Sequence, residues 1–223
     1  HEVAGIIGSN GAGKTTFFNL LTGYFEPDEG IILYRGEDVT RMTPQQRVSC
    51  GIMRTFQLTS TFDNLSVIDN LVLAFFRAHK KATLIQLLLN TCKSQRNDPR
   101  IVHTLETFDL QELRDREVRN LSLGEKRRLE IAMAILAEPR VLLLDEPLAG
   151  LAESEIQGVL AVLRKQVGKQ TILIVEHKIS HVQDFLQRLT VMHEGRVIAD
   201  GAPQECLHHP EVRAISFVGS SDI

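Results

Sequence analysis

The sequence predicts an α/β protein with a mostly parallel sheet and a helical insertion. Short apolar runs that fit buried strands alternate with segments of helical apolar spacing, both before residue 60 and after residue 135. Between those limits helical spacing recurs, interrupted by a polar stretch over 93–99 that indicates a loop. A glycine-rich turn between the first strand and the first helix indicates where this fold would hold a ligand.

The first element is the apolar run Val3–Ile7, and a phosphate-cradling loop follows it directly. The loop fits the pattern G-x-x-x-x-G-K-[ST], and Thr16 comes next; its residues are Gly8, Ser9, Asn10, Gly11, Ala12, Gly13, Lys14 and Thr15. Its glycines let backbone N–H groups form a nest for phosphate oxygens, and the helix over 15–22 directs its positive end at the same anion. Lys14 would reach the outer phosphates, and Thr15 would hold Mg²⁺.

A glycine-rich turn without a ligand is the simpler interpretation of this segment. The complete motif, with a strand before it and a helix after it, favours nucleotide binding. The motif alone leaves open the class of P-loop protein and the identity of the base.

Further elements follow from caps, breakers and periodicity. Before residue 60 we expect a strand over Ile31–Tyr34, a helix begun by Thr43 and Pro44, and a short strand ending near Phe56-Gln57. In the middle of the chain, Ser66 caps a helix over 67–78, and helical spacing recurs over 84–92 and 101–108.

The last third returns to alternation. We expect helices over 129–137 and 156–167, buried strands over 141–144 and 171–175, and a hairpin of 189–192 with 196–199 around Glu194-Gly195.

Two carboxylates end the buried strand Val141–Leu144. Ligands of open α/β sheets bind at the carboxyl ends of strands, so Asp145 would hold Mg²⁺ and Glu146 would polarise an attacking water as a general base. A solvated pair of strand-end carboxylates is the alternative for these residues taken alone. Leu121–Glu125 likewise has two interpretations: Ser122 and Glu125 form a capping box, and a helix N-terminus containing Gly124 is also an anion site.

Composition narrows the class of protein. The chain has 223 residues, 43% of them apolar, enough for one sizeable globular unit, and its net charge of −3 gives no indication of nucleic-acid binding. Three scattered cysteines indicate reduced thiols, and no signal peptide or bilayer-spanning apolar stretch is evident. Because His1 already lies in the strand that feeds the loop, we expect that the natural N-terminus is missing.

Taken together, these motifs resemble an ATP-binding-cassette (ABC) ATPase along essentially the whole chain. The resemblance is carried by Gly8–Thr15, Gln57, Leu121–Glu125, Asp145-Glu146 and His177, in the order and approximate spacing of that family. It implies a P-loop NTPase fold and a single ATPase domain. Its RecA-like parallel-sheet core would take approximately 1–59 and 136–223, and an inserted α-helical signature subdomain approximately 60–135.

The resemblance also implies roles for residues. ATP and Mg²⁺ would be the ligands, with Thr15, Gln57 and Asp145 at the metal and Glu146, Gln57 and His177 in catalysis. Two cassettes pack head to tail in that family, so Ser122, Leu123, Gly124 and Glu125 would face the ATP of a partner subunit, with Ser122 and Gly124 at its γ-phosphate. His177 would contact the γ-phosphate within its own subunit; without the other motifs it would be interpreted as a surface residue.

Three departures from the family pattern stand out. Leu123 replaces a usual glycine, Glu125 a usual glutamine, and Ala152 a usual aspartate of the D-loop. The last puts the contacts of that loop across the dimer in doubt. No residue of this chain can be named as the aromatic that stacks on adenine.

Finer features resemble the ATP subunits of bacterial branched-chain amino acid importers and of the related urea and amide importers. These features are Arg54–Gln57, Phe62–Asn70, Arg127–Ala132 and the tail after Gly201. They imply a second cassette, identical or not, transmembrane permease subunits, and indirectly a periplasmic solute-binding protein, but no nucleic acid. We expect the chain at the cytoplasmic face of the inner membrane, peripheral there and soluble when isolated.

A P-loop also occurs in proteins with two other kinds of function. A soluble cassette ATPase acting on ribosomes or DNA usually carries two cassettes in one chain or a long coiled-coil insertion, and this sequence shows neither. A GTPase or small-molecule kinase is disfavoured by the lack of an Asn-Lys-x-Asp motif and by the Leu121–Glu125 segment.

Overall fold

The computed structural model describes residues 1–55, 61–79, 95–177 and 179–218. Contacts divide the chain into two compact units, and each is described by itself. Unit 1 comprises His1–Arg54, Arg140–Pro147 and Val167–Ile223, and unit 2 comprises Thr55–Pro139 and Leu148–Gln166.

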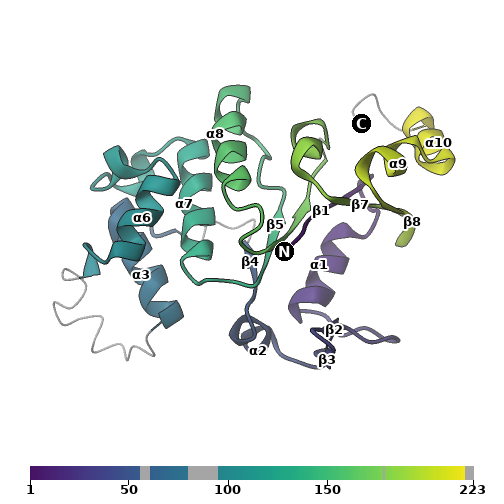
Figure 1. Cartoon of the computed structure of the whole chain (residues 1–223), viewed down its shortest axis with the longest axis horizontal. Coiled ribbons are helices and arrows are strands. Elements are labelled where there is room, and N and C mark those ends of the chain that lie inside the picture. Colours follow the sequence, from purple (N-terminus) through teal and green to yellow (C-terminus); the bar gives the residue numbers. More distant parts are fainter. Residues whose placement is uncertain (56–60, 80–94, 178, 219–223) are drawn as a thin grey trace. The chain divides into compact units, whose positions relative to one another are not determined.

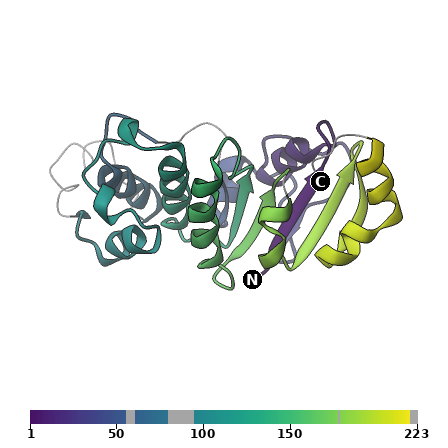
Figure 2. The ribbon, with the colours of Figure 1, turned by 90° about the horizontal axis from the view of Figure 1, so that it is seen from above.

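A six-stranded sheet in the order β4-β5-β6-β1-β7-β8 dominates unit 1 (Figure 2). Its strands are β1 (Val3–Gly8), β4 (Ile52–Thr55), β5 (Val141–Asp145), β6 (Thr171–Val175), β7 (Arg188–His193) and β8 (Arg196–Gly201). β1 pairs in parallel with both β6 and β7, and β5 with β6, whereas β7 and β8 form an antiparallel hairpin. The expected mostly parallel α/β sheet is therefore confirmed, and the parallel carboxyl ends of β1, β5 and β6 share one edge.

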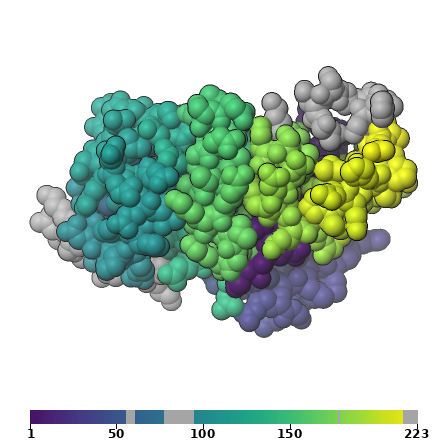
Figure 3. All heavy atoms as spheres, turned by 45° about the horizontal axis from the view of Figure 1, so that its top comes forward, coloured from purple at the N-terminus to yellow at the C-terminus, as the bar shows by residue number. Residues whose placement is uncertain are grey.

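Among the residues that the structure describes, unit 1 has these helical segments: α1 (Lys14–Thr22), α2 (Pro44–Ser49), α9 (Pro203–His208), α10 (Pro210–Val218) and the 3-10 turns η3 (Ile179–His181) and η4 (Gln183–Phe185). α1 ends at Gly23, which adopts a φ of 79° at the C-cap. α9 packs on β7 and β8; Figure 1 labels these elements, and α9 and α10 are the yellow atoms in Figure 3. Ile6, Phe18, Leu143 and Val175 join the buried core.

The predicted strand over Ile31–Tyr34 is shorter than expected and does not belong to the main sheet. Only β2 (Leu33–Tyr34) forms, and it pairs with β3 (Glu37–Asp38) in a separate two-stranded sheet. Ile31 is 67% exposed and Leu33 is 58% exposed. The predicted strand is therefore confirmed only over Leu33–Tyr34, and its first two residues lie outside any strand.

The helical segments of unit 2 are α3 (Val67–His79), α6 (Pro99–Thr107), α7 (Leu123–Ile135), α8 (Glu153–Arg164) and the 3-10 turns η1 (Gln111–Leu113) and η2 (Val118–Asn120). α3 packs against α6 and α7, and α7 packs against α8. Fully buried side chains such as Phe75, Ile101, Leu129 and Val159 form the interior. The helix expected over 84–92 lies outside the described residues.

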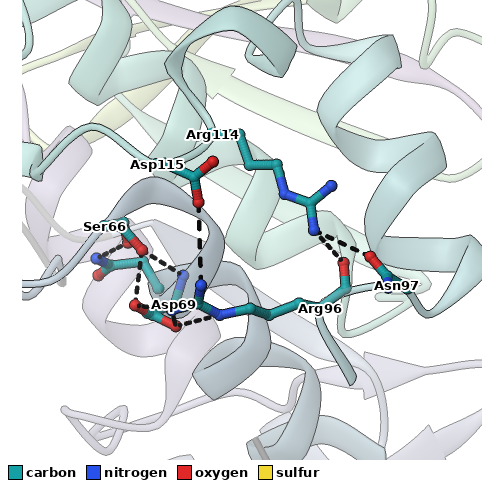
Figure 4. Close-up of polar contacts among 7 residues, drawn as sticks. Ser66, Asp69, Arg96, Asn97, Arg114 and Asp115 are labelled. Carbon is teal, nitrogen blue, oxygen red and sulfur yellow. Dashed lines mark hydrogen bonds and ion pairs between the residues drawn. The ribbon is translucent and has the colours of Figure 1, made fainter. Parts of the chain in front are cut away.

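An arginine links the start of α3 to two other segments of unit 2 (Figure 4). The guanidinium of Arg96 donates to both carboxylate oxygens of Asp69, with Nη2 at 2.6 and 2.8 Å from them, and lies 3.9 Å from Asp115. The hydroxyl of Ser66 donates to Asp69 at 2.7 Å and accepts from its backbone N–H, which confirms Ser66 as the cap of α3. We call this group, Ser66, Asp69, Arg96 and Asp115, the Arg96 cluster.

Within the described parts of the chain, no helix combines the length and the apolar character that crossing a bilayer would require.

Candidate active site

The loop between β1 and α1 takes the conformation that its glycines allow. Gly11 and Gly13 adopt φ values of 81° and 96°, a region that side chains other than glycine rarely enter. Gly8 is required for a different reason: a Cβ there would lie 2.3 Å from the carbonyl oxygen of Met192. The loop therefore leads directly into the first turn of α1, and the N-terminus of a helix attracts anions.

Solvent reaches most of this loop, while its lysine is held beneath it. Ser9, Asn10, Gly11, Thr15 and Thr16 are exposed, and Lys14 is only 6% exposed. Lys14 Nζ donates to the carbonyl oxygens of Gly8 at 2.7 Å and Ser9 at 3.1 Å. An ammonium group has three donors, so one of them is left for a ligand.

The charge on Lys14 is set by opposing influences. Burial lowers the pKa of its ammonium group, and the negative charges of Glu146 and Asp145 oppose that shift. Lys14 therefore lies close enough to Asp145, the last residue of β5, and to Glu146, the next residue, for their charges to act on it.

Glu146 and His177 meet at the carboxyl ends of β5 and β6. The His177 Nε2 atom lies 3.0 Å from Glu146 Oε1. The Glu146 backbone N–H donates to the carbonyl of Val175 at 2.9 Å, and its φ of 47° turns the chain sharply out of β5. Because this strained turn aims the carboxylate at an exposed histidine, the pair can hold and move a proton at the edge of the sheet.

Asp145 is buried and paired with an arginine that the sequence reasoning did not assign to the site. Arg54 Nη2 donates to Asp145 Oδ2, and Arg54 Nη1 donates to Asn19 Oδ1 at 2.7 Å. The guanidinium also lies 5.4 Å from the centroid of the Phe18 ring. In the sequence, the only sign of this role is that Arg54 is a cation near the end of a predicted strand. Its pairing with Asp145 depends on the sheet order, which makes β4 and β5 neighbours.

The residues of this edge fit a magnesium ion. Asp145 Oδ1 is buried and, among the described residues, has no hydrogen-bond partner, so it retains acceptor capacity. No group of three or more His, Cys, Asp or Glu side chains in the described ranges could hold a metal by itself. Mg²⁺ typically takes one or two protein carboxylates together with water and substrate phosphates, and Asp145 with the exposed Thr15 hydroxyl suits that pattern.

The segment Leu121–Glu125 lies in unit 2, where it begins α7. Ser122 is the N-cap: its Oγ accepts from the N–H of Glu125 at 3.2 Å, and Glu125 accepts from the N–H of Ser122 at 2.8 Å, so the predicted capping box forms. The N–H of Gly124 donates to Glu155 Oε1 at 3.0 Å. Glu155 was not predicted, and the signal that could have found it is its place in the first turn of the helix after Ala152.

The structure thus brings Lys14, Asp145, Glu146 and His177 together in unit 1. The segment Leu121–Glu125, which we call the signature, lies in unit 2. Gln57 lies outside the described residues.

Comparisons with known proteins identify the family of this chain. Residues 1–149 match the family described as ABC transporter. The chain is 34% identical to the high-affinity branched-chain amino acid transport ATP-binding protein BraF of Pseudomonas aeruginosa, covering 95% of this chain and 85% of that protein. It is 37% identical to the corresponding protein LivG of Escherichia coli K12, with the same two coverages.

Two further similarities bear on the range of functions. The chain is 35% identical to the lipopolysaccharide export system ATP-binding protein LptB of Acidithiobacillus ferridurans, covering 96% of this chain and 84% of that protein. Among solved structures, the ADP conformation of MJ1267, an ATP-binding cassette of an ABC transporter, matches with a TM-score of 0.80 and 30% identity, covering 98% of this chain and 88% of that one. This chain therefore belongs to the ABC transporter family and is an ATP-binding, ATP-hydrolysing subunit of a transporter.

Proposed function

We propose that this ATPase drives the import of branched-chain amino acids across a membrane. ATP hydrolysis is supported by the contact of Glu146 with His177 and by the closeness of Glu146 to Lys14 of the phosphate loop. The cargo is supported by the similarity to BraF and LivG, two ATP-binding proteins of branched-chain amino acid transport.

The phosphate loop supplies the binding energy for ATP. Backbone N–H groups from Gly8 to Thr15, with Thr16 beside them, receive phosphate oxygens, and the remaining donor of Lys14 takes an outer phosphate. Thr15 and Asp145, with Gln57, would hold Mg²⁺. When bound, the ion neutralises charge that develops on the phosphates.

Glu146 is proposed as the general base. Its carboxylate accepts a proton from the attacking water, and His177 at 3.0 Å orients that carboxylate and reaches the terminal phosphate. Arg54 fixes Asp145 in place through its guanidinium. Ser122, Leu123, Gly124 and Glu125 would act on the ATP of a second cassette, identical or different.

The remaining assignments concern assembly. We treat residues 1–223 as one ATPase domain, with a core near 1–59 and 136–223 and an inserted helical subdomain near 60–135. Transmembrane permease subunits would receive the motion of the paired cassettes, and a periplasmic solute-binding protein would supply the cargo. This assembly would place the chain on the cytoplasmic face of the inner membrane.

Lipopolysaccharide export is the second candidate function. It is favoured by the 35% identity to LptB, which is close to the identities with the two amino acid transport proteins.

Uptake of radiolabelled leucine tests the import proposal. The gene for this chain is expressed in Escherichia coli that lacks LivG, and we expect high-affinity leucine uptake to be restored. The Lys14→Ala variant, which lacks the phosphate-binding ammonium group, is the control and should restore none. Restoration of growth in cells depleted of LptB, without restored leucine uptake, would instead support export and contradict import.

A further inference from the structure

The first turn of α7 contains donors that resemble a phosphate site. Ser122 caps the helix, and Gly124 stands at its second position. Under the proposed function, the hydroxyl of Ser122 and the N–H of Gly124 bind the terminal phosphate of the ATP held by a partner subunit. In this structure both donors face an anion that belongs to the chain itself.

That anion is the carboxylate of Glu155, in the first turn of α8. Its Oε1 accepts from the N–H of Gly124 at 3.0 Å, and its Oε2 accepts from the N–H of Ala152 at 3.2 Å. Hydrogen bonds from Gly124, from the Ser122 hydroxyl and from Ala152, in that order, lower the pKa of Glu155. Its carboxyl group is therefore ionised at neutral pH.

The two turns also touch through their backbones and side-chain stems. A Cβ placed on Gly124 would lie 2.7 Å from the Cβ of Glu155, so glycine is needed there to let Glu155 approach. A Cβ on Gly150 would lie 3.4 Å from Cδ2 of Leu123. The signature turn and the D-loop before α8 therefore form one packed surface within unit 2.

We propose that Glu155 is an internal competitor for the partner's ATP: its carboxylate occupies the signature donors until a terminal phosphate displaces it. This inference rests on the proposed function, because it assumes that Ser122 and Gly124 receive that phosphate. Glu155 is not a catalytic residue. It is a positioning residue that sets how readily two cassettes close on nucleotide.

Competition follows from the number of donors and from charge. One backbone N–H cannot donate at full strength to two acceptors, and two anions sharing one helix N-terminus repel each other. After displacement, Glu155 still accepts from Ala152 and so still satisfies a donor at the start of α8.

The contact itself is tested on the nucleotide-free subunit. The amide of Gly124 is followed by NMR and by hydrogen exchange in the wild type, Glu155→Gln and Glu155→Ala. We expect the Gly124 amide to exchange faster in Glu155→Ala than in the wild type. An unchanged Gly124 amide signal and exchange rate in both variants would overturn the proposal.

The competition is tested by ATP-dependent dimerisation. Glu146→Gln serves as the background because loss of the general base keeps ATP from being consumed, and dimers are measured by sedimentation velocity over a range of ATP concentrations. Glu155→Ala should lower the ATP concentration for half-maximal dimerisation by about threefold to tenfold, the scale of one charge-assisted hydrogen bond at a partly exposed site. Glu155→Gln should fall between the two, since it keeps an acceptor but loses the charge.

Matched controls separate the possible outcomes. Glu153→Gln removes one negative charge from the same turn of α8 and should leave dimerisation unchanged. If Glu155→Ala needs as much ATP as the background or more, Glu155 does not compete and the proposal is overturned. If Glu146→Gln does not dimerise with ATP at any concentration, the proposed function is contradicted. The NMR experiment then tests only whether Glu155 contacts Gly124.

Discussion

At the scale of single residues, the proposed general base Glu146 stands on a strained turn with a φ of 47°. Glutamine has the same shape as glutamate and tolerates the φ of 47° about equally, but its amide cannot accept a proton from water. Glu146→Gln should therefore retain ATP binding and lose turnover by about 10²- to 10⁴-fold. Calorimetry with ATP and a phosphate-release assay measure the two effects. A variant that hydrolyses ATP at the wild-type rate would refute Glu146 as the base.

Arg54 raises a question of stability, because it pairs with the buried carboxylate of Asp145. Its side chain is 8% exposed and that of Asp145 is 1% exposed, so replacing Arg54 by methionine leaves a buried carboxylate without its counter-ion. We expect a loss of about 3 kcal/mol in the free energy of unfolding, measured by urea denaturation.

Arg188→Met is the matched control for Arg54. Arg188 also pairs with an aspartate in unit 1, Asp200, but the two side chains are 52% and 34% exposed. Solvent screening leaves such a pair worth about 1 kcal/mol or less. Equal losses of unfolding free energy in the two variants would show that burial does not increase the contribution of the Arg54–Asp145 pair to stability.

At the scale of elements, the Arg96 cluster holds the start of α3. Asp69 accepts from both Ser66 and Arg96, and asparagine would keep one acceptor while losing the charge. Asp69→Asn should lower the free energy of unfolding, measured by thermal denaturation, by about 1 kcal/mol. The loss is small because the Arg96 and Asp69 side chains are 33% and 28% exposed, so solvent partly screens their charges. Asp115→Asn, at 3.9 Å and 77% exposed, should have almost no effect. A larger loss of stability in Asp115→Asn than in Asp69→Asn would show that Asp69 is not the carboxylate that holds the start of α3.

The elements also show what the sequence can and cannot predict. β5 and β6 were predictable because five consecutive residues of each pack on both faces, so an apolar run is their local signature. The caps at Thr43, Ser66 and Ser122 were predictable because an N-cap hydrogen bond involves residues only three positions apart.

The contacts of Arg54 with Asp145 and of Glu155 with Gly124 could not be read from local pattern. The first joins residues 91 apart in sequence and depends on strand order, and the second joins residues 31 apart and depends on how α8 packs on α7. The strand expected over Ile31–Tyr34 forms only over Leu33–Tyr34 for a related reason: its length depends on the strand it pairs with, and its partner β3 has two residues.

At the scale of the whole molecule, the proposed sites are composite: each would combine unit 1 of one subunit with unit 2 of another. Two inactive variants with defects in different units should then complement each other. Lys14→Ala removes the phosphate-binding ammonium in unit 1. Ser122→Asp keeps a good N-cap for α7 but puts a negative charge where the partner's phosphate would bind.

Mixing these two variants distinguishes composite sites from sites that one subunit completes alone. Random pairing makes about half of the dimers mixed, and each mixed dimer has one intact site and one doubly defective site, so roughly a quarter of the wild-type sites are restored. We expect ATPase activity in the mixture to rise well above that of either variant measured alone at the same total concentration. If the mixture is no more active than the average of its components, each subunit hydrolyses ATP without its partner's signature, and the head-to-tail arrangement does not apply to this chain.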